Sequence, residues 1–303
     1  MYKVTSSWPH QDQIKVEWNL GKRCNYDCAY CPSVIHDNTS PHTDLAILEQ
    51  TVDKLVSIGR PIRLSFTGGE PTVHPHIEDL LEYCRRKGVF WVNLTTNGTR
   101  PSRWYLNNEM YFNHLVFSLH FEYDWKRVVH TINQFYDETE IDFFVNVMAH
   151  HQHMDEVRTV VAQFIQKGIK FAVRRIRWTE GDHNIFDDLR YEGYDLQWLL
   201  DMDATVKANV RIDDSAIMHA NDVIKLHKNQ FKGWSCNAGI ESLMINWDGD
   251  VHRATCRVGG SLGNIYTGTF DVPTEPIICT RDWCTCAADI PLTKTSNDHP
   301  TSV

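Results

Sequence analysis

Apolar and polar positions alternate between two periods along residues 13–176. Runs with the apolar pattern of strands are separated by stretches with helical spacing. The strand-type runs are Ile14–Leu20, Ile62–Phe66, Phe90–Leu94, His114–Leu119, Asp142–Val147 and Lys170–Ile176. The helix-type stretches are Leu45–Ile58, Ile77–Lys87, Trp125–Phe135 and Met154–Gln166. This order predicts an α/β fold with a parallel sheet, either a barrel or doubly wound, and six strands favour a partial (β/α)6 TIM-like barrel.

The pattern weakens outside this core. Residues 177–234 are polar and aromatic without a steady period, which predicts a bridging or substrate-covering segment with a helix over Asp195–Asp203. From Ser235 apolar and polar residues alternate on both sides of Asp248-Gly249, and an Asp-Gly pair is a strong hairpin turn signal. Residues 235–287 are therefore expected to form a small β-hairpin domain. Residues 1–12 are interpreted as an N-terminal extension and the polar residues 288–303 as a flexible tail.

Composition narrows the class of protein. The 303 residues are 42% hydrophobic and 23% charged, which excludes a disordered or collagen-like chain. No run approaches the roughly 18 apolar residues that cross a bilayer, and no secretory signal is visible at the start, so we expect a cytoplasmic protein with no membrane partner. The net charge of -9 argues against nucleic acid as a partner.

Three of the nine cysteines lie close together after the first predicted strand. Cys24, Cys28 and Cys31 are spaced so that one loop carries three thiols. In a reducing compartment, clustered cysteines point first to metal binding. Three thiolates can hold three corners of a 4Fe–4S cube, which leaves the fourth iron open to a ligand that is not protein. Zinc or coincidence is the alternative.

The second predicted strand ends in Gly68-Gly69-Glu70-Pro71. Paired glycines allow a backbone to approach a ligand closely, and a glutamate can receive an ammonium group. Together with the three-cysteine loop, this motif resembles the signature of the radical SAM superfamily, over residues 13 to about 176. The resemblance implies that the three cysteines hold a 4Fe–4S cluster whose open iron is chelated by S-adenosylmethionine.

The resemblance also implies a set of residues around that cofactor. Glu70 would pair with the methionine ammonium, and an arginine would meet its carboxylate. The residues assigned in this way are Tyr30, Gly68, Gly69, Glu70, Asn97, Ser118 and one of Arg174 and Arg175. Asn97 is as readily interpreted as a plain turn former. His120 and Glu122 follow a predicted strand end, where barrel enzymes place substrate groups, and are candidate catalytic residues. His150, His151 and His153 are expected in a solvated loop.

A second group of cysteines occupies the C-terminal region, around the predicted hairpin. Its order resembles the SPASM domain, or its shorter Twitch form, which holds auxiliary iron–sulfur clusters in radical SAM enzymes. The cysteines are Cys236, Cys256, Cys279, Cys284 and Cys286. Five thiols can complete one 4Fe–4S cube with one to spare. The preferred ligands are Cys236, Cys256, Cys284 and Cys286, with Cys279 a close alternate, and zinc is the second choice of metal.

The chemistry that the resemblance implies is reductive cleavage of S-adenosylmethionine to a 5′-deoxyadenosyl radical, which abstracts a hydrogen atom from the substrate. The electron would come from a reductant such as flavodoxin or ferredoxin. The expected substrate is a peptide, an amino acid or another small molecule, with the auxiliary cluster assisting oxidation or positioning. Two alternatives stay open: modification of a nucleotide or nucleic-acid base, and a non-catalytic iron–sulfur or zinc protein on the same scaffold.

Overall fold

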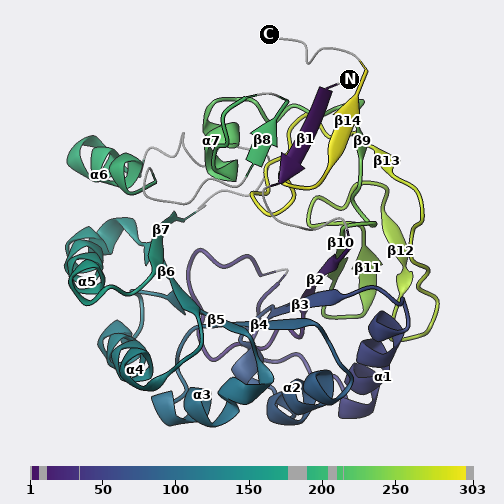
Figure 1. The fold of residues 1–303 in the computed structure, drawn as a ribbon. Coiled ribbons are helices and arrows are strands. Elements are labelled where there is room, and N and C mark those ends of the chain that lie inside the picture. Colours follow the sequence, from purple (N-terminus) through teal and green to yellow (C-terminus); the bar gives the residue numbers. More distant parts are fainter. Residues whose placement is uncertain are drawn as a thin grey trace.

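The computed structural model describes residues 2–6, 12–33, 35–176, 190–203, 210–213 and 215–297. Its larger sheet has the strand order β12-β11-β10-β2-β3-β4-β5-β6-β7 (Figure 1). Six of these strands run parallel and in chain order: β2 (Ile14–Asn19), β3 (Ile62–Thr67), β4 (Trp91–Thr96), β5 (His114–Leu119), β6 (Phe143–Ala149) and β7 (Phe171–Arg175). The six predicted strands and their parallel arrangement are confirmed.

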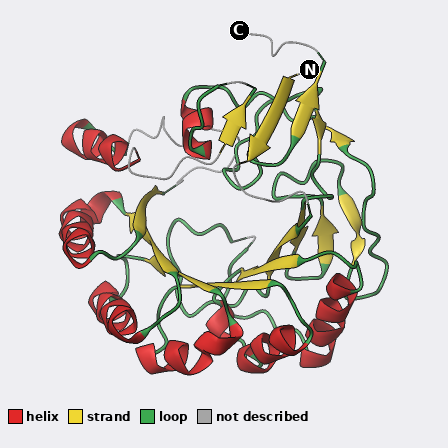
Figure 2. Cartoon of the chain, viewed as in Figure 1, coloured by secondary structure: helices red, strands yellow, loops and turns green. Residues whose placement is uncertain are grey.

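Helices cover one face of this sheet, and the sheet curves away from them (Figure 2). They are α1 (Leu45–Val56), α2 (Ile77–Arg86), α3 (Ser102–Asn108), α4 (Trp125–Glu138) and α5 (Met154–Lys167). Four match the predicted helices. The fifth, α3, is missing from the sequence prediction because its seven residues bury only Tyr105 and Asn108 and so show no apolar stripe.

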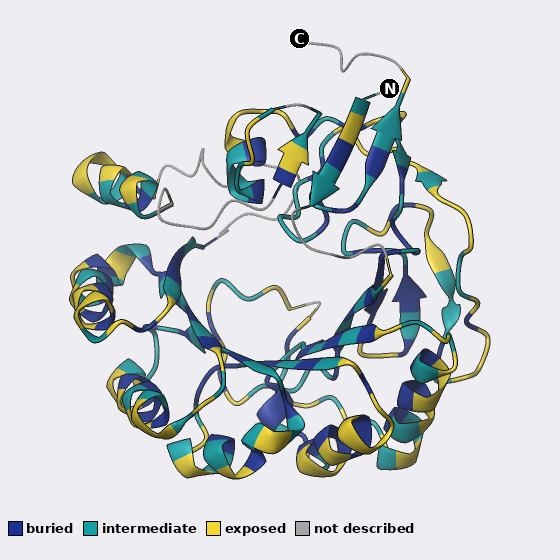
Figure 3. Cartoon of the chain, viewed as in Figure 1, coloured by how far each residue is buried: buried dark blue, intermediate teal, exposed yellow. Residues whose placement is uncertain are grey.

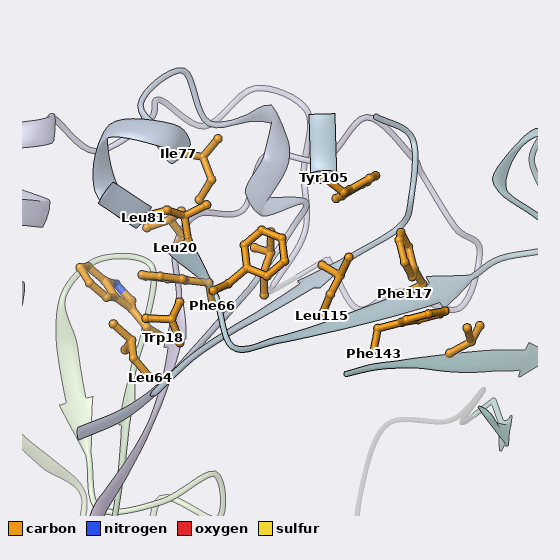
Figure 4. Packing of buried hydrophobic residues seen from close by; sticks show 14 of the residues in the cluster. Trp18, Leu20, Leu64, Phe66, Ile77, Leu81, Tyr105, Leu115, Phe117 and Phe143 are labelled. Carbon is orange, nitrogen blue, oxygen red and sulfur yellow. The ribbon is translucent and has the colours of Figure 1, made fainter. Parts of the chain in front are cut away.

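The core lies between this helical layer and the sheet (Figure 3). Every second residue of β3 is buried, so that Ile62, Leu64 and Phe66 face the helices and the residues between them face the concave side. Figure 4 shows Phe66 and Trp18 near the side chains of α2, and the Trp18 and Phe66 ring centroids are 5.6 Å apart. The polar ends of the strands are thereby held at one edge of the sheet, which is where the candidate site lies.

The C-terminal hairpin continues the large sheet. β10 (Ser242–Ile245) and β11 (Asp250–His252) pair antiparallel across the Asp248-Gly249 turn, as the sequence predicts, and β12 (Ser261–Asn264) follows. β10 also pairs in parallel with β2, and the Trp18 indole donates to the Tyr266 hydroxyl at 3.0 Å. The hairpin is therefore part of the central sheet, where the sequence suggests a separate small domain.

A smaller sheet joins the two ends of the described chain. Its order is β13-β9-β14-β1-β8, with β1 (Tyr2–Ser6), β8 (Val210–Ile212), β9 (Ser235–Cys236), β13 (Ile277–Ile278) and β14 (Lys294–Ser296). The expectations of an N-terminal extension at 1–12 and a flexible tail from 288 are corrected here, because β1 and β14 pair with each other. Both escape a pattern search since each buries a single side chain, Val4 or Lys294.

Two further helices lie between β7 and β9 in the sequence. The predicted helix at Asp195–Asp203 is confirmed as α6 (Gly193–Asp203), and α7 (Ala220–Lys225) follows β8. Of the segment 177–234, which is predicted to bridge or to cover the substrate, residues 177–189, 204–209 and 214 lie outside the described residues. Among the helices that are described, none is long and apolar enough to cross a membrane.

Candidate cofactor and metal sites

A cavity of about 250 Å³ lies at the carboxyl ends of β2 to β5. It is lined by the loop after β2, the glycine-rich end of β3, and the ends of β4 and β5. The sequence-predicted residues on its wall are Cys24, Cys28, Tyr30, Cys31, Gly68, Gly69, Glu70, Asn97, Ser118 and His120. The parallel topology therefore brings together motifs that are up to about a hundred residues apart in the chain.

The two glycines admit the backbone that leads into the cysteine loop. Gly68 has φ +118°, and a Cβ atom there would lie 2.5 Å from the Gly21 carbonyl oxygen. A Cβ on Gly69 would lie 2.3 Å from the Arg23 carbonyl oxygen. The Gly69 amide donates to Gly21 O at 2.8 Å, and the Glu70 amide donates to Arg23 O at 2.9 Å. Besides lining the cavity, the glycine pair thus fixes where the cysteine loop starts.

Glu70 is the buried acid of the site, with 3% of its surface exposed. Its Oε1 accepts from the Thr72 amide, the Thr72 hydroxyl and the Thr96 hydroxyl at 3.0, 2.6 and 2.8 Å, and its Oε2 accepts from the Asn97 amide at 2.6 Å. Burial raises the pKa of this carboxyl, and the hydrogen bonds oppose that rise. Because Oε2 accepts from one donor among the described residues, it keeps an acceptor position for a cationic group.

Asn97 is both a turn residue and a contact of the cysteine loop. Its Oδ1 accepts from the Thr99 amide and hydroxyl at 3.2 and 2.8 Å, as a turn-forming asparagine does. Its Nδ2 donates to Asn25 Oδ1 at 2.8 Å and lies 4.0 Å from Cys24 Sγ. The two interpretations of this residue are therefore compatible.

The segment that follows β5, residues 120–123, makes several contacts with the cysteine loop. His120 Nδ1 lies 2.5 Å from the Tyr30 hydroxyl and 3.7 Å from Cys28 Sγ. Glu122 Oε2 accepts from the Ala29 amide at 3.1 Å, and the Tyr123 hydroxyl accepts from the Asp27 amide. Burial lowers the pKa of His120 to about 4, so the ring is neutral near pH 7. His120 and Glu122, the candidate catalytic residues, both contact the loop, and His120 also lines the cavity.

His150 lies beside this segment, and sequence reasoning misplaced it. It is 3% exposed, where a solvated loop is expected, and its Nε2 is 3.7 Å from Glu122 Oε1. The polar sequence around it gives no sign of this burial. A histidine placed directly after a strand end is the available signal.

Arg174 and Arg175, of which one is predicted to meet the methionine carboxylate, are not among the residues that line the cavity. Arg174 donates from Nε to Asn146 Oδ1 on β6 at 2.8 Å. Both arginines end β7, the last strand of the sheet, which is separated from β5 by β6. The alternation of side chains along a strand cannot reveal this separation, because it depends on how far the sheet curves.

The donor set at the loop fits a multi-iron cluster. Burial raises the pKa of the Cys28 thiol to about 12 and that of Cys24 to about 11, so binding of a metal as thiolates releases protons. Within the described residues, no three His, Cys, Asp or Glu side chains are arranged to hold a single metal ion. A zinc ion needs its ligands converging on one point, whereas a cluster spreads them over several irons.

Four cysteines from separate segments surround a second cavity. They are Cys236 on β9, Cys256 after β11, Cys279 after β13, and Cys284. Cys279 reaches Cys236 because β13 pairs antiparallel with β9, with Ile277 opposite Cys236. Burial raises the pKa of the Cys256 thiol to about 11 and also raises that of Cys284. Lys294, Asp289 and Arg281 share the wall of this cavity.

The fifth cysteine, Cys286, is absent from the wall of the second cavity. Burial raises the pKa of its thiol, and the charges of Asp289 and Glu17 add to that rise. The structure thus brings Cys279 to the other three thiols, where the sequence favours Cys286. The reason is the two-residue strand β13, whose ladder with β9 has no visible signal in the sequence.

Comparison with known proteins places the chain in a family. Residues 18–176, just over half of the chain, match the model of the Radical SAM superfamily. Fe-coproporphyrin III synthase of Methanosarcina barkeri is 38% identical over 90 residues, which are 29% of this chain and 22% of that protein. GTP 3′,8-cyclase of Desulforamulus reducens is 38% identical over 81 residues, 25% of this chain and 24% of that protein.

These curated relatives are therefore matched over about a quarter or less of their own lengths. Among solved structures, anSMEcpe with bound AdoMet is similar in fold, with a TM-score of 0.57 at 17% identity, over 85% of this chain and 79% of that one. A further structure of anSMEcpe holds AdoMet and the Cp18Cys peptide. Fold, cysteine loop and family match agree, and the chain belongs to the radical SAM superfamily.

Proposed function

We propose that this protein is a radical SAM enzyme that binds a 4Fe–4S cluster through Cys24, Cys28 and Cys31 and S-adenosylmethionine beside it. The observation that carries the proposal is one cavity lined by all three thiols, by the Gly68–Glu70 segment and by the ends of β4 and β5. A purely structural metal site would need neither an open corner nor a buried acid next to it.

Each part of the cavity has a task in this proposal. Glu70 Oε2 accepts a hydrogen bond from the methionine ammonium, and Ser118 and Asn97 bound the cofactor on the β4–β5 side. Tyr30 and Glu122 hold the loop so that its thiols face the same space. When bound, the cluster and S-adenosylmethionine supply a 5′-deoxyadenosyl radical once an electron arrives from a flavodoxin- or ferredoxin-type reductant. The chain contributes placement and exclusion of competing groups.

The second cavity is proposed to hold an auxiliary 4Fe–4S cluster on Cys236, Cys256, Cys279 and Cys284. Four thiols match the four ligands that a closed cluster takes. On this proposal the core is a partial (β/α)6 barrel, and the C-terminal region is a Twitch-like variant whose hairpin has merged with the core sheet. The cluster would assist oxidation of the substrate or its positioning.

The proposed substrate is a peptide, an amino acid or another small molecule. The structure of anSMEcpe with bound AdoMet and the Cp18Cys peptide, which is similar in fold to this chain, supports a substrate of this kind. A nucleotide is the second candidate, because a relative of the core acts as a GTP 3′,8-cyclase. The formal charge of -9 counts against a nucleic acid.

Metal content and cofactor cleavage test the proposal together. Anaerobically purified protein should carry about eight irons and as many sulfides per chain, if both cubes are present. With dithionite it should convert S-adenosylmethionine to 5′-deoxyadenosine. Zinc in place of iron at the loop, or no cleavage by fully loaded protein, would refute the assignment. Deuterated candidate substrates then identify the substrate class, since the true one transfers its label to 5′-deoxyadenosine.

A further inference from the structure

Lys294 on β14 is a buried cation on the wall of the second cavity. It is 2% exposed. Its Nζ donates to the carbonyl oxygens of Asp289, Ile290 and Leu292 at 2.7, 2.9 and 3.1 Å. An ammonium has three donors, so all are used on backbone groups. The side chain thus closes residues 289–294 into a loop around its own charge.

The Lys294 charge is not paired directly with an acid, although Asp289 shares the cavity wall. In the described part of the chain, no Asp or Glu oxygen lies within the 4.0 Å of an ion pair with Lys294 Nζ. The Asp289 carboxylate is instead an acceptor for the Cys256 amide, at 2.8 Å. A buried charge without a counter-charge is costly, so the position indicates that an anion belongs nearby.

The pairing of β14 with β9 places Lys294 next to the cysteines. Lys294 is the cross-strand partner of Cys236, and both line the cavity with Cys256, Cys279 and Cys284. The Lys294 charge also lowers the pKa of Cys236 and Cys284 against the larger rise caused by burial. Four thiolates around a metal centre would carry a net negative charge. This charge would be the counter-charge of the buried ammonium.

We propose that Lys294 is the counter-charge of the four-cysteine centre and raises the reduction potential of the cluster bound there. This inference rests on the auxiliary cluster proposed above. One electron entering that cluster from a reductant such as dithionite makes it more negative by one charge, and a fixed cation stabilises this form over the oxidised one. Close burial strengthens the effect, because the protein interior screens charges weakly.

Two other charged groups on the wall are less suited to this role. Arg281 is exposed, so solvent screens it, and its guanidinium is bound to the Cys256 carbonyl at 2.9 Å. Asp289 is also buried, and its carboxylate accepts from the Cys256 amide at 2.8 Å, so it is already bound to the backbone. Lys294 is therefore the buried cation on this wall. Phe231 lies on its other side, with the ring centroid 5.2 Å from Nζ, and keeps water away.

The test is a redox titration of the second centre alone. The parent carries alanine at Cys24, Cys28 and Cys31, and is compared with the same protein bearing Lys294→Met, Lys294→Arg or Lys232→Met. Lys232 is a matched control, because its exposed ammonium pairs with Asp282 near the same cysteines. Spin resonance during dithionite titration reports the reduced fraction. Lys294→Met should reduce the ratio of reduced to oxidised cluster about tenfold at the parent's midpoint, while the other two stay close to the parent.

Several outcomes overturn the inference. An unchanged midpoint in Lys294→Met does so, as does an equal shift in Lys294→Arg, which would assign the effect to the carbonyl contacts. If Lys294→Met loses its iron, retention by Lys294→Arg supports the counter-charge and loss by both refutes it. A parent that binds zinc refutes the auxiliary cluster, and the counter-charge is then judged by zinc affinity, which must fall in Lys294→Met and not in Lys294→Arg. A parent without metal refutes both.

Discussion

The two cysteine sites differ in thiol number and in whether a buried cation lies beside them. The first has three thiols on one loop and the acid Glu70, which is 3% exposed. The second has four thiols, the cation Lys294, which is 2% exposed, and the buried Asp289, whose carboxylate accepts from the Cys256 amide. A centre with an open corner needs a further ligand, and an acid suits a ligand that carries an ammonium. A centre with four thiolates needs no further ligand, and a cation offsets its negative charge.

The difference teaches that buried charge can distinguish a reactive centre from a closed one. Thiol number alone leaves both sites open to zinc or iron. The charge of the neighbouring buried side chain indicates the charge of the group that would bind at each site. This contrast gives predictions that differ for the two sites.

The largest expected effect is at the first site. Cys28→Ala should abolish cleavage of S-adenosylmethionine, lowering 5′-deoxyadenosine formation by about a hundredfold or more, because one cluster corner is lost. Iron at the second site should remain. Cys84→Ala is the control, since Cys84 is a fully buried thiol on α2 away from both cavities. Cleavage by Cys28→Ala at the parental rate would show that the loop is not the cofactor site.

The next effect separates the ligands of the second site. On a background without the first cluster, Cys279→Ser should lose most of the iron, because its thiol lines the cavity. Cys286→Ser should keep most of it. Iron per chain and the spin-resonance signal decide between them. The reverse result would restore the ligand set that the sequence favours, and full iron in both variants would mean that neither thiol is needed.

Glu70→Gln should weaken binding of S-adenosylmethionine about tenfold or more, because an amide replaces the charged acceptor. It should also lower the free energy of unfolding by about 1–3 kcal/mol, since an amide cannot accept from all four donors that Glu70 serves. Calorimetry of the cluster-loaded protein measures the affinity. Glu78→Gln, at an exposed acid on α2, is the control. Equal affinity in wild type and Glu70→Gln would show that Glu70 does not bind the methionine ammonium.

Acid should destabilise the first site more than the second. Burial lowers the pKa of His74, just after Glu70, to about 4 from an ordinary 6.5. Stability from neutral His74 is therefore complete above pH 6.5 and is lost as the pH falls toward 4, by about 2 kcal/mol. Hydrogen exchange of the metal-free protein across this range should show the segment after β3 opening first. His74→Gln should remove this dependence, and an equal response of β9 and β14 would contradict it.

The smallest effect concerns the loop itself. Glu122→Ala should speed amide exchange at Ala29 in the metal-free protein, by the loss of one hydrogen bond worth about 1 kcal/mol. Tyr123→Phe should do the same at Asp27. Tyr83→Phe, which removes a hydroxyl contact with Asp53 on the far helices, is the control and should leave both amides unchanged. Unchanged exchange in all three would mean that the loop is ordered by the glycine segment alone.

The first site was predictable because its parts sit at strand ends. The sequence shows β2 to β5 by their apolar pattern, and a parallel sheet collects their carboxyl ends at one edge. The motifs at Cys24–Cys31 and Gly68–Glu70 therefore meet whatever the details of the helices. The contact of Arg174 or Arg175 with the cofactor stays a prediction, because the distance across the sheet depends on its curvature.

The second site was predictable only in part. Its cysteines are visible in the sequence, but their grouping depends on β9 and β13, strands of two residues each. Such strands have too few positions to show a period. Lys294 is a stronger case, since hydrophobic patterns assign a lysine to the surface. Its burial follows from three carbonyl contacts within its own segment, which no spacing rule describes.

The pairing of β1 with β14 sets an order on folding. Val4 lies opposite Lys294, so almost the whole described chain must be present before these two strands can meet. The sheet of β2 to β7, by contrast, is built from neighbours in the sequence. Closing so long a loop costs entropy that local pairings do not, and contacts of this kind form late. The wall of the second site that Lys294 provides is thus expected to form after the sheet that carries the first site.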